Sequence, residues 1–257
     1  MCAAVARGVG MPRVLFFGQV DEHWVLVSEL LGPTLEDLVQ FCHDPALIVP
    51  NVLSVKTVLL IAIEAVARVK YIHSKGILHR DLRPDNLLMG TGNKGNILYV
   101  IDFGLATEFP PAEIPEPTDG KDVAPILFAG TIAYASARNH LHKQQGWADD
   151  LEGLAYVFRR LLRGNLPWDD GYRDYSDKEA SLKIGEAKNA ITGEQLFEGF
   201  PDVFAKYYNY VRRLAFDERP NYVYLTNLFR NAYARQRYKH DKVFDWTEKI
   251  YNSVRDI

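Results

Sequence analysis

The residues best suited to chemistry lie in two short motifs near the middle of the chain. Asp81 and Asn86 belong to the run H-R-D-L-R-P-D-N at 79–86, and Asp102 opens the tripeptide D-F-G after an apolar run. A carboxylate can orient a hydroxyl group and accept its proton, while carboxylate and amide oxygens bind Mg²⁺. One tight loop can present Asp81 and Asn86 to the same point, and the apolar run predicts a strand that ends at Asp102. These residues therefore predict phosphoryl transfer from a Mg²⁺-bound nucleotide to a hydroxyl group, with Asp81 as the base and Asn86 and Asp102 as metal ligands.

Each motif taken alone is a weak signal. A single His-Arg-Asp is usually a solvated turn, and a single Asp-Phe-Gly is usually a turn with an anchored aromatic ring. Together, in this order, they match the signature set of protein kinases, H-R-D-L-x-x-x-N followed by D-F-G. The combination indicates a site of kinase ancestry, and whether that site still turns over is a separate question.

Composition and charge exclude several other classes of protein. The 257 residues carry 30 basic and 33 acidic side chains, so the chain has no global basic field to attract nucleic acid or membrane lipid. Two cysteines, Cys2 and Cys42, are too few for a disulfide framework, and the first ten residues lack the apolar core of a signal peptide. The longest apolar runs are too short to span a bilayer. We expect an intracellular protein, cytoplasmic or nuclear, without a nucleic-acid or membrane partner.

The hydrophobic pattern predicts strands first and then mostly helices. Two β-branched and aromatic runs at 14–17 and 24–27 form an expected hairpin through 18–23, and an extended connector follows at 29–33. Helical periodicity and its stop signals predict helices at 34–42, 54–74, 147–163 and 200–237, the last with a break at 219–221. The proline-rich segment from Glu108 to Pro125 is expected to be a mobile loop.

A narrower resemblance is carried by strings outside the two motifs. These strings are L-L-G-P-T-L-E-D-L at 30–38, K-T-V-L at 56–59, G-T-I-A-Y-A-S at 130–136, D-D-L-E at 149–152, R-G-N-L-P-W at 163–168, F-D-E-R-P-N-Y at 216–222 and V-F-D-W at 243–246. They resemble the casein kinase I family of serine/threonine protein kinases, in which a Tyr-Ala-Ser stretch replaces the usual Ala-Pro-Glu. The resemblance runs from about residue 8 to residue 246.

The resemblance implies an α+β, protein-kinase-like fold. Residues 1–31 would be the remnant of an antiparallel small lobe and its hinge, and residues 32–257 the mostly helical large lobe. The implied activity is transfer of the γ-phosphate of ATP, bound with Mg²⁺, to a serine or threonine hydroxyl of a protein substrate. A monomer is the expected state.

The resemblance also implies a nucleotide site. Glu29 and Leu31 would belong to the hinge whose backbone binds adenine, Asp37 would meet the ribose, and Leu88 and Ile101 would form the apolar floor beneath the base. Leu88 and Ile101 would be buried in any packed fold, so their burial alone does not indicate a ligand.

Further roles concern the environment of Asp81. The resemblance implies that Thr131 supports the Asp81 carboxylate and that Asp150, borne on a helix, binds the backbone of the 79–86 loop. Arg83 occupies the position of a family lysine that meets the γ-phosphate. His79 is expected to be a packed core histidine without a role in proton transfer.

Three departures from the family pattern predict impaired activity. The resemblance begins just after the position of the family's third helix, so the Gly-rich loop, the Val-Ala-Ile-Lys strand and the helix with the paired Glu are expected to be missing from this chain. Arg83 replaces a compact ammonium by a planar guanidinium. Ala133 stands where the family has an arginine that reads acidic or phosphorylated substrates, so that preference is not carried over.

Three functions therefore stay open. The first is a serine/threonine kinase of casein kinase I type, impaired in this chain. The second is a pseudokinase that acts as a binding or scaffold module, which the missing lysine, Arg83 and Ala133 favour. The third, a kinase of small molecules, ranks last because the strings at 134–136 and 149–152 indicate a protein substrate.

Overall fold

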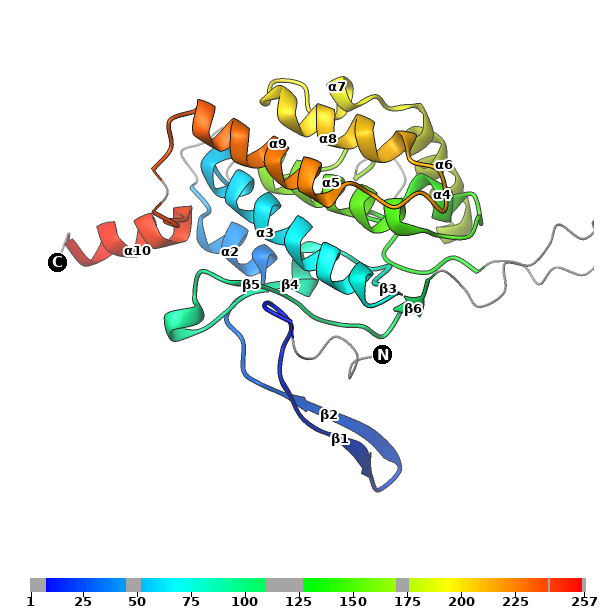
Figure 1. The fold of residues 1–257 in the computed structure, drawn as a ribbon, viewed down its shortest axis with the longest axis horizontal. Coiled ribbons are helices and arrows are strands. Elements are labelled where there is room, and N and C mark those ends of the chain that lie inside the picture. Colours follow the sequence, from blue (N-terminus) through cyan, green and yellow to red (C-terminus); the bar gives the residue numbers. More distant parts are fainter. Residues whose placement is uncertain (1–7, 45–51, 110–126, 170–175, 240, 256–257) are drawn as a thin grey trace, which may run out of the picture.

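Helices make up most of the part of the chain that the computed structural model describes, which is residues 8–44, 52–109, 127–169, 176–239 and 241–255. The body of the molecule is formed by α3 (Val55–Ser74), α5 (Trp147–Arg163), α8 (Asp202–Arg213) and α9 (Tyr222–Arg235). In Figure 1, α3 packs against both α9 and α5, and α5 packs against α8. The shorter helices are α2 (Leu35–Phe41), α4 (Ala137–His140), α6 (Asp177–Ala190), α7 (Gly193–Leu196) and α10 (Asp245–Arg255).

Local signals explain why the predicted helices at 34–42, 54–74 and 147–163 are confirmed. Helix α3 begins after Ser54, whose hydroxyl accepts a hydrogen bond from the Thr57 amide, and the chain leaves it through Gly76 at φ 69°. Helix α5 ends at Arg163 and is capped by Gly164, which adopts φ 80°. Val58, Leu59, Ala62 and Val66 of α3 are fully buried, and burial of each Val or Leu side chain contributes roughly 1.5–3 kcal/mol.

The helical structure predicted for 200–237 is confirmed, and the predicted break at 219–221 lies between two separate helices. Helix α8 starts only after Pro201 and ends at Arg213, while α9 begins after Asn221, whose side chain accepts a hydrogen bond from the Tyr224 amide. Helices α4, α6, α7 and α10 were not predicted. The α6 sequence is polar around most of its circumference, so it carries little of the periodic signal on which a helix prediction depends.

The strands form three separate two-stranded antiparallel sheets. They pair β1 (Val14–Val20) with β2 (His23–Ser28), β3 (Ile77–Leu78) with β6 (Thr107–Glu108), and β4 (Leu87–Met89) with β5 (Leu98–Val100). The predicted hairpin is confirmed, but its strands are longer than expected. Pairing continues to Val20 opposite His23, so the turn contains only Asp21, at φ 53°, and Glu22.

The α+β prediction, mostly helical with a few antiparallel strands, is confirmed. The predicted loop begins at Glu108, which is in β6, and its residues 110–125 lie outside the described residues. Within the described ranges, no helix is long and apolar enough to cross a membrane.

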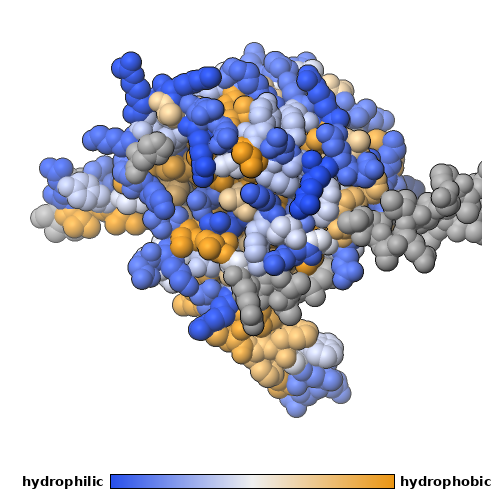
Figure 2. Space-filling model, viewed as in Figure 1, coloured by the Kyte–Doolittle hydropathy of each residue, from blue (hydrophilic) through white to orange (hydrophobic). Residues whose placement is uncertain are grey.

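The β1–β2 hairpin projects away from the helical body (Figure 1). Figure 2 shows that most of its surface is apolar, with a hydrophilic tip. The large apolar side chains of this hairpin, each at least 43% exposed, are Leu15, Phe16, Phe17, Val20, Trp24, Leu26 and Val27. The hairpin therefore buries little apolar surface of its own, in contrast to the helices.

Candidate active site

The 79–86 loop is anchored to the helical body by a buried carboxylate. Asp150, in the first turn of α5, accepts hydrogen bonds from the backbone amides of His79 at 2.7 Å and Arg80 at 2.8 Å. His73 contacts the same carboxylate through Nε2 at 2.9 Å, and its Nδ1 lies 2.6 Å from the hydroxyl of Tyr222. Burial alone would raise the pKa of Asp150, but the hydrogen bonds from His73 and the backbone lower it below its usual value.

The Asp81 carboxylate is held by donors on both of its oxygens. Thr131 donates to Oδ1 from its backbone N at 2.9 Å and from Oγ1 at 2.7 Å. Asn86 donates from Nδ2 to Oδ2 at 3.2 Å and to the Asp81 carbonyl at 2.9 Å. The short 3₁₀ turn η1 (Pro84–Asn86) folds Asn86 back over Asp81, as the five-residue spacing predicted. The carboxylate is thus fixed in position before any substrate binds.

Arg83 lies next to Thr131 and pairs with Asp85. Its Nε and Nη2 contact Asp85 Oδ2 at 2.9 and 2.8 Å, and its Nη1 donates to Thr131 Oγ1 at 3.2 Å. Burial lowers the pKa of Arg83, but the Asp85 carboxylate outweighs this and raises it above its usual value. The site therefore keeps one permanent cation close to the Asp81–Thr131 contact.

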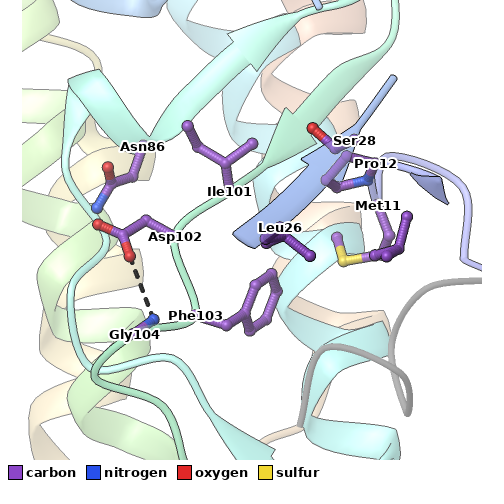
Figure 3. A pocket seen from close by; sticks show the side chains of 10 residues that line it. Met11, Pro12, Leu26, Ser28, Asn86, Ile101, Asp102, Phe103 and Gly104 are labelled. Atoms are coloured by element: carbon purple, nitrogen blue, oxygen red, sulfur yellow. Dashed lines mark hydrogen bonds between the residues drawn. The ribbon is translucent and has the colours of Figure 1, made fainter. Parts of the chain in front are cut away.

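Asp102 reaches the site through backbone pairing. The Ile101 amide donates to the Asn86 carbonyl at 3.0 Å, so Asp102 follows directly beside Asn86. Asp102 adopts φ 63°, a left-handed conformation, and its Oδ1 accepts a hydrogen bond from the Gly104 amide at 3.2 Å. Asp102 and Asn86 both line one pocket and come together at one end of it in Figure 3.

His79 and Phe103 pack next to the backbone that leads into Asp102. His79 is fully buried, its Nε2 lies 2.9 Å from the Ile101 carbonyl, and the Phe103 ring packs edge-on against it at 4.9 Å between centroids. The expectation that His79 is a packed core histidine is confirmed. Phe103 was not singled out from the sequence, although its place in the D-F-G motif was a signal that could have found it.

The pocket beside Asn86 and Asp102 has a volume of about 560 Å³ and a mostly apolar lining. Figure 3 shows the hairpin residues on one side of it and the Asn86–Asp102 corner on the other. The lining residues are Met11, Pro12, Val14, Leu26, Ser28, Asn86, Ile101, Asp102, Phe103 and Gly104. The first five were missed by the sequence reasoning. The sequence offered one signal for them: Leu26 and Ser28 are two positions apart in the expected strand, so their side chains point to the same face.

A family comparison decides the ancestry of this site. The family model described as protein kinase domain matches residues 13–211, well over half of the chain. The chain belongs to the protein kinase domain family. Its fold is the protein kinase fold, with small antiparallel sheets before a mostly helical part. Membership implies a phosphotransferase that uses ATP and Mg²⁺ and acts on protein substrates.

The kinase domain brings only some of the predicted nucleotide residues to the pocket. Ile101 lines it, whereas Glu29, Leu31, Asp37 and Leu88 are not among its lining residues. Glu29 and Leu31 lie in the connector after β2, Asp37 lies in α2, and Leu88 lies in β4. The Leu31 amide and carbonyl make no hydrogen bond to another backbone group within the described residues.

Asp37 and Glu29 have structural partners. Asp37 Oδ2 accepts hydrogen bonds from the amide and the hydroxyl of Thr34, at 3.0 and 2.7 Å, which forms a capping box at the start of α2. These bonds from Thr34 lower the pKa of Asp37. The Glu29 carboxylate accepts from the Arg13 amide at 3.0 Å and pairs with Lys94 at 3.2 Å. The nucleotide roles of these residues stay predictions.

The donor set fits Mg²⁺ bound together with phosphate. Within the described ranges, no three His, Cys, Asp or Glu side chains lie close enough to hold a metal ion by themselves. Asn86 and Asp102 offer an amide and a carboxylate oxygen, and Mg²⁺ in kinase sites usually takes one or two protein ligands and completes its shell with water and phosphate oxygens. The two residues would hold the ion, which would neutralise charge on the phosphates.

The Gly-rich spacing of kinases does occur in this chain, but at a different place. Residues 90–95 read G-x-G-x-x-G and form the turn between β4 and β5 around η2 (Gly92–Lys94), where the Gly90 amide donates to the Ile97 carbonyl. These glycines close a hairpin and do not line the pocket. Among the described lining residues there is also no lysine or arginine.

Proposed function

We propose that this kinase domain is a serine/threonine protein kinase of casein kinase I type, which transfers the γ-phosphate of ATP to a protein hydroxyl. The observation that carries the proposal is the fixed Asp81 carboxylate, hydrogen-bonded to Thr131 and Asn86, with Asp102 beside Asn86. Asp81 would orient the acceptor hydroxyl and take its proton, and Asn86 and Asp102 would hold Mg²⁺. ATP as the donor is consistent with an intracellular setting.

Secondary roles follow from the same geometry. Thr131 donates two short hydrogen bonds to Asp81 Oδ1, whereas Oδ2 accepts a longer one from Asn86 Nδ2 at 3.2 Å, so Oδ2 is the oxygen that is better placed to accept the proton. Arg83 supplies a cation next to Thr131 for the γ-phosphate, although its guanidinium is already paired with Asp85. In the proposed nucleotide site, the backbone at Glu29 and Leu31 binds adenine, Asp37 meets the ribose, and Leu88 and Ile101 lie beneath the base.

Contacts between the family-like strings support the finer assignment. Ser136, which ends the G-T-I-A-Y-A-S string, caps α4 and donates its hydroxyl to Asp149, and the Ala137 amide donates to Glu152 at 2.8 Å. Two strings on which the casein kinase I resemblance depends thus pack on each other. Their side chains and backbone hold the segment that carries Thr131.

We expect residues 1–257 by themselves to transfer phosphate slowly. A positioned lysine and a covering Gly-rich loop hold the ATP phosphates in line, and loss of such positioning costs several kcal/mol of transition-state stabilisation, or orders of magnitude in rate. The described lining of the pocket contains no cation that could replace them. Nucleotide binding should also be weak.

The lack of a cation among the described lining residues of the pocket favours a pseudokinase as the second candidate. A cation-free pocket and an exposed apolar hairpin suit a module that binds a partner without turnover. The intact set of Asp81, Asn86 and Asp102 argues against this alternative, because a binding module has no need of a fixed base and two metal ligands.

Phosphate transfer to a generic protein substrate tests the proposal. It should be measured for residues 1–257, for Asp81→Asn, and for a chimera that adds a casein kinase I small lobe. Asp217→Asn, at an exposed position, is the matched control. We expect the chimera to transfer phosphate, and we expect Asp81→Asn to abolish this activity. A folded chimera that binds ATP without any transfer would support the pseudokinase, and strong Asp81-dependent activity of residues 1–257 would overturn the expected impairment.

A further inference from the structure

Lys188 is a charged side chain buried in the helical body without a carboxylate in direct contact. It lies on α6 and is 0% exposed. Its Nζ donates to the carbonyls of Ile132 and Ala135, each at 2.7 Å, and lies 3.1 Å from Nε2 of His140. An ammonium group has three N–H donors, and here two carbonyl oxygens and one ring nitrogen surround Nζ. Burial of such a group is costly unless its N–H donors find acceptors, and the two backbone carbonyls supply acceptors at short range.

The surroundings of Lys188 favour its bound position. Its Nζ lies 4.9 Å from the ring centroid of Tyr156 and 4.8 Å from that of Trp168, within the range of cation–π attraction. Burial lowers its pKa well below the usual value, and the more distant Glu152 and Asp169 act against this.

The imidazole beside Lys188 can serve as an acceptor. Burial and the neighbouring Lys188 lower the pKa of His140 to about 4, so the ring is neutral at physiological pH. Its Nδ1 lies 2.9 Å from the hydroxyl of Ser181, and its Nε2 lies 3.1 Å from Lys188 Nζ and 3.2 Å from the Ile132 carbonyl.

The acceptors of Lys188 belong to the segment that carries Thr131. We define the residues 130–135 as the Thr131 segment. Besides the two carbonyls bound by Lys188, the Ala133 carbonyl accepts a hydrogen bond from Trp168 Nε1 at 2.9 Å. The amides of Tyr134 and Ala135 donate to the Thr131 carbonyl at 2.9 and 2.8 Å. Lys188 and Trp168 therefore fix the segment from one side, and Thr131 binds Asp81 from the other.

We propose that Lys188 is a positioning residue, which holds the Thr131 segment so that Thr131 stays hydrogen-bonded to the Asp81 carboxylate. Its importance for catalysis rests on the proposed function, because it acts through Thr131 on the proposed base. Lys188 does not touch the reacting atoms. Its contribution is to keep a surface segment in one conformation from within the core.

The test compares Lys188→Met with Lys178→Met on the same helix, where the side chain is exposed. Methionine keeps the length of the side chain and removes the three donors. The readouts are the NMR position of the Thr131 amide proton, which a hydrogen bond to a carboxylate shifts downfield, and hydrogen exchange at Thr131, Tyr134 and Ala135. Asp81→Ala provides the reference position for a lost contact.

In Lys188→Met, the Thr131 resonance should move toward its position in Asp81→Ala, and exchange in the Thr131 segment should rise by about tenfold or more. Hydrogen exchange at the amides of the α5 core should be the same as in the unchanged protein. In Lys178→Met, exchange and the Thr131 resonance should both be the same as in the unchanged protein. Equal loss of protection in α5 and the segment, or an unmoved Thr131 resonance, would overturn the proposal.

Trp168→Phe covers the case in which Lys188→Met does not fold. It removes only the donor to the Ala133 carbonyl and should produce a smaller change of the same kind. An unmoved Thr131 resonance in a folded Trp168→Phe protein, with Lys188→Met unfolded, would also count against the proposal. None of these readouts requires phosphate transfer, so the proposal and the proposed function can fail separately.

Discussion

The helical body and the β1–β2 hairpin are folded from equally apolar sequence, but they bury it to very different extents. Phe158 of α5 is 0% exposed and packs against Phe204, Tyr207 and Phe229, whereas Phe17 of β1 is 65% exposed and stacks on Trp24 with 5.4 Å between the ring centroids. The proposed base and its supports depend on the helical body. One wall of the pocket depends on the hairpin. The molecule thus combines a well-buried helical body, which holds Asp81, with a weakly buried hairpin, which lines the pocket.

The largest contrast is expected from the same substitution in the two regions. Phe158→Ala should lower the free energy of unfolding by about 3–5 kcal/mol, because it removes a fully buried ring and leaves a cavity. Phe17→Ala should lower it by less than about 1 kcal/mol, since it removes mainly one ring contact. Urea denaturation of both variants measures the difference. Similar losses in the two would show that the hairpin is as well supported as the body.

This contrast marks what could be predicted from the sequence. Helices α3 and α5 were predictable because their periodic apolar faces and their caps, Ser54 and Gly164, are local signals. Helix α6 was not, because one of its buried anchors is Lys188, and a lysine is expected on the solvent side of a helix.

The candidate site was predictable in its motifs and not in its pocket. The spacing from Asp81 to Asn86 is a local property of one loop, and the contact of Asp81 with Thr131 followed from a family resemblance. The pocket wall from Met11 to Ser28 depends on contacts between residues more than 50 positions apart in the chain, which no local pattern specifies.

A second prediction concerns the pH dependence of the helical body. Burial raises the pKa of Asp149 to about 6, despite hydrogen bonds from Gly146 and Ser136. A raised carboxyl pKa means that its contribution to stability is present below about pH 4 and is lost as the pH rises through 6. The expected loss is roughly 3 kcal/mol for a shift of about two units.

Asp149→Asn should remove this term, so its free energy of unfolding should fall less than that of the unchanged protein between pH 4 and pH 7. Urea denaturation across this range measures the slope. Asp217→Asn, at an exposed position, should keep the slope of the unchanged protein. Equal slopes in all three proteins would contradict the assignment of Asp149.

The smallest effect on stability is expected in the hairpin. Trp24 is 70% exposed on a two-stranded sheet whose outer edges pair with no other strand among the described residues, a surface that promotes association between copies. Trp24→Lys should change the free energy of unfolding by less than about 1 kcal/mol while it reduces concentration-dependent self-association.

Sedimentation velocity over a range of concentrations measures that association. Val223→Lys is the control, because it adds the same charge at a 61% exposed apolar residue on α9, away from the hairpin. An equal reduction in both variants would mean that net charge, and not the hairpin surface, sets the association.

The central claim is that Asn86 and Asp102 form one metal-binding corner beside the fixed Asp81. Mn²⁺ accepts the same oxygen ligands as Mg²⁺ and broadens the NMR signals of nearby protons. Residues 1–257, labelled with ¹⁵N, should be titrated with Mn²⁺ and ATP, with Mg²⁺ and ATP as the reference and Asp102→Asn as the variant. The side-chain amide of Asn86 and the backbone amide of Gly104 should broaden first in the unchanged protein and should not do so in Asp102→Asn. Broadening that begins elsewhere, or that persists at Asn86 in Asp102→Asn, would contradict the account.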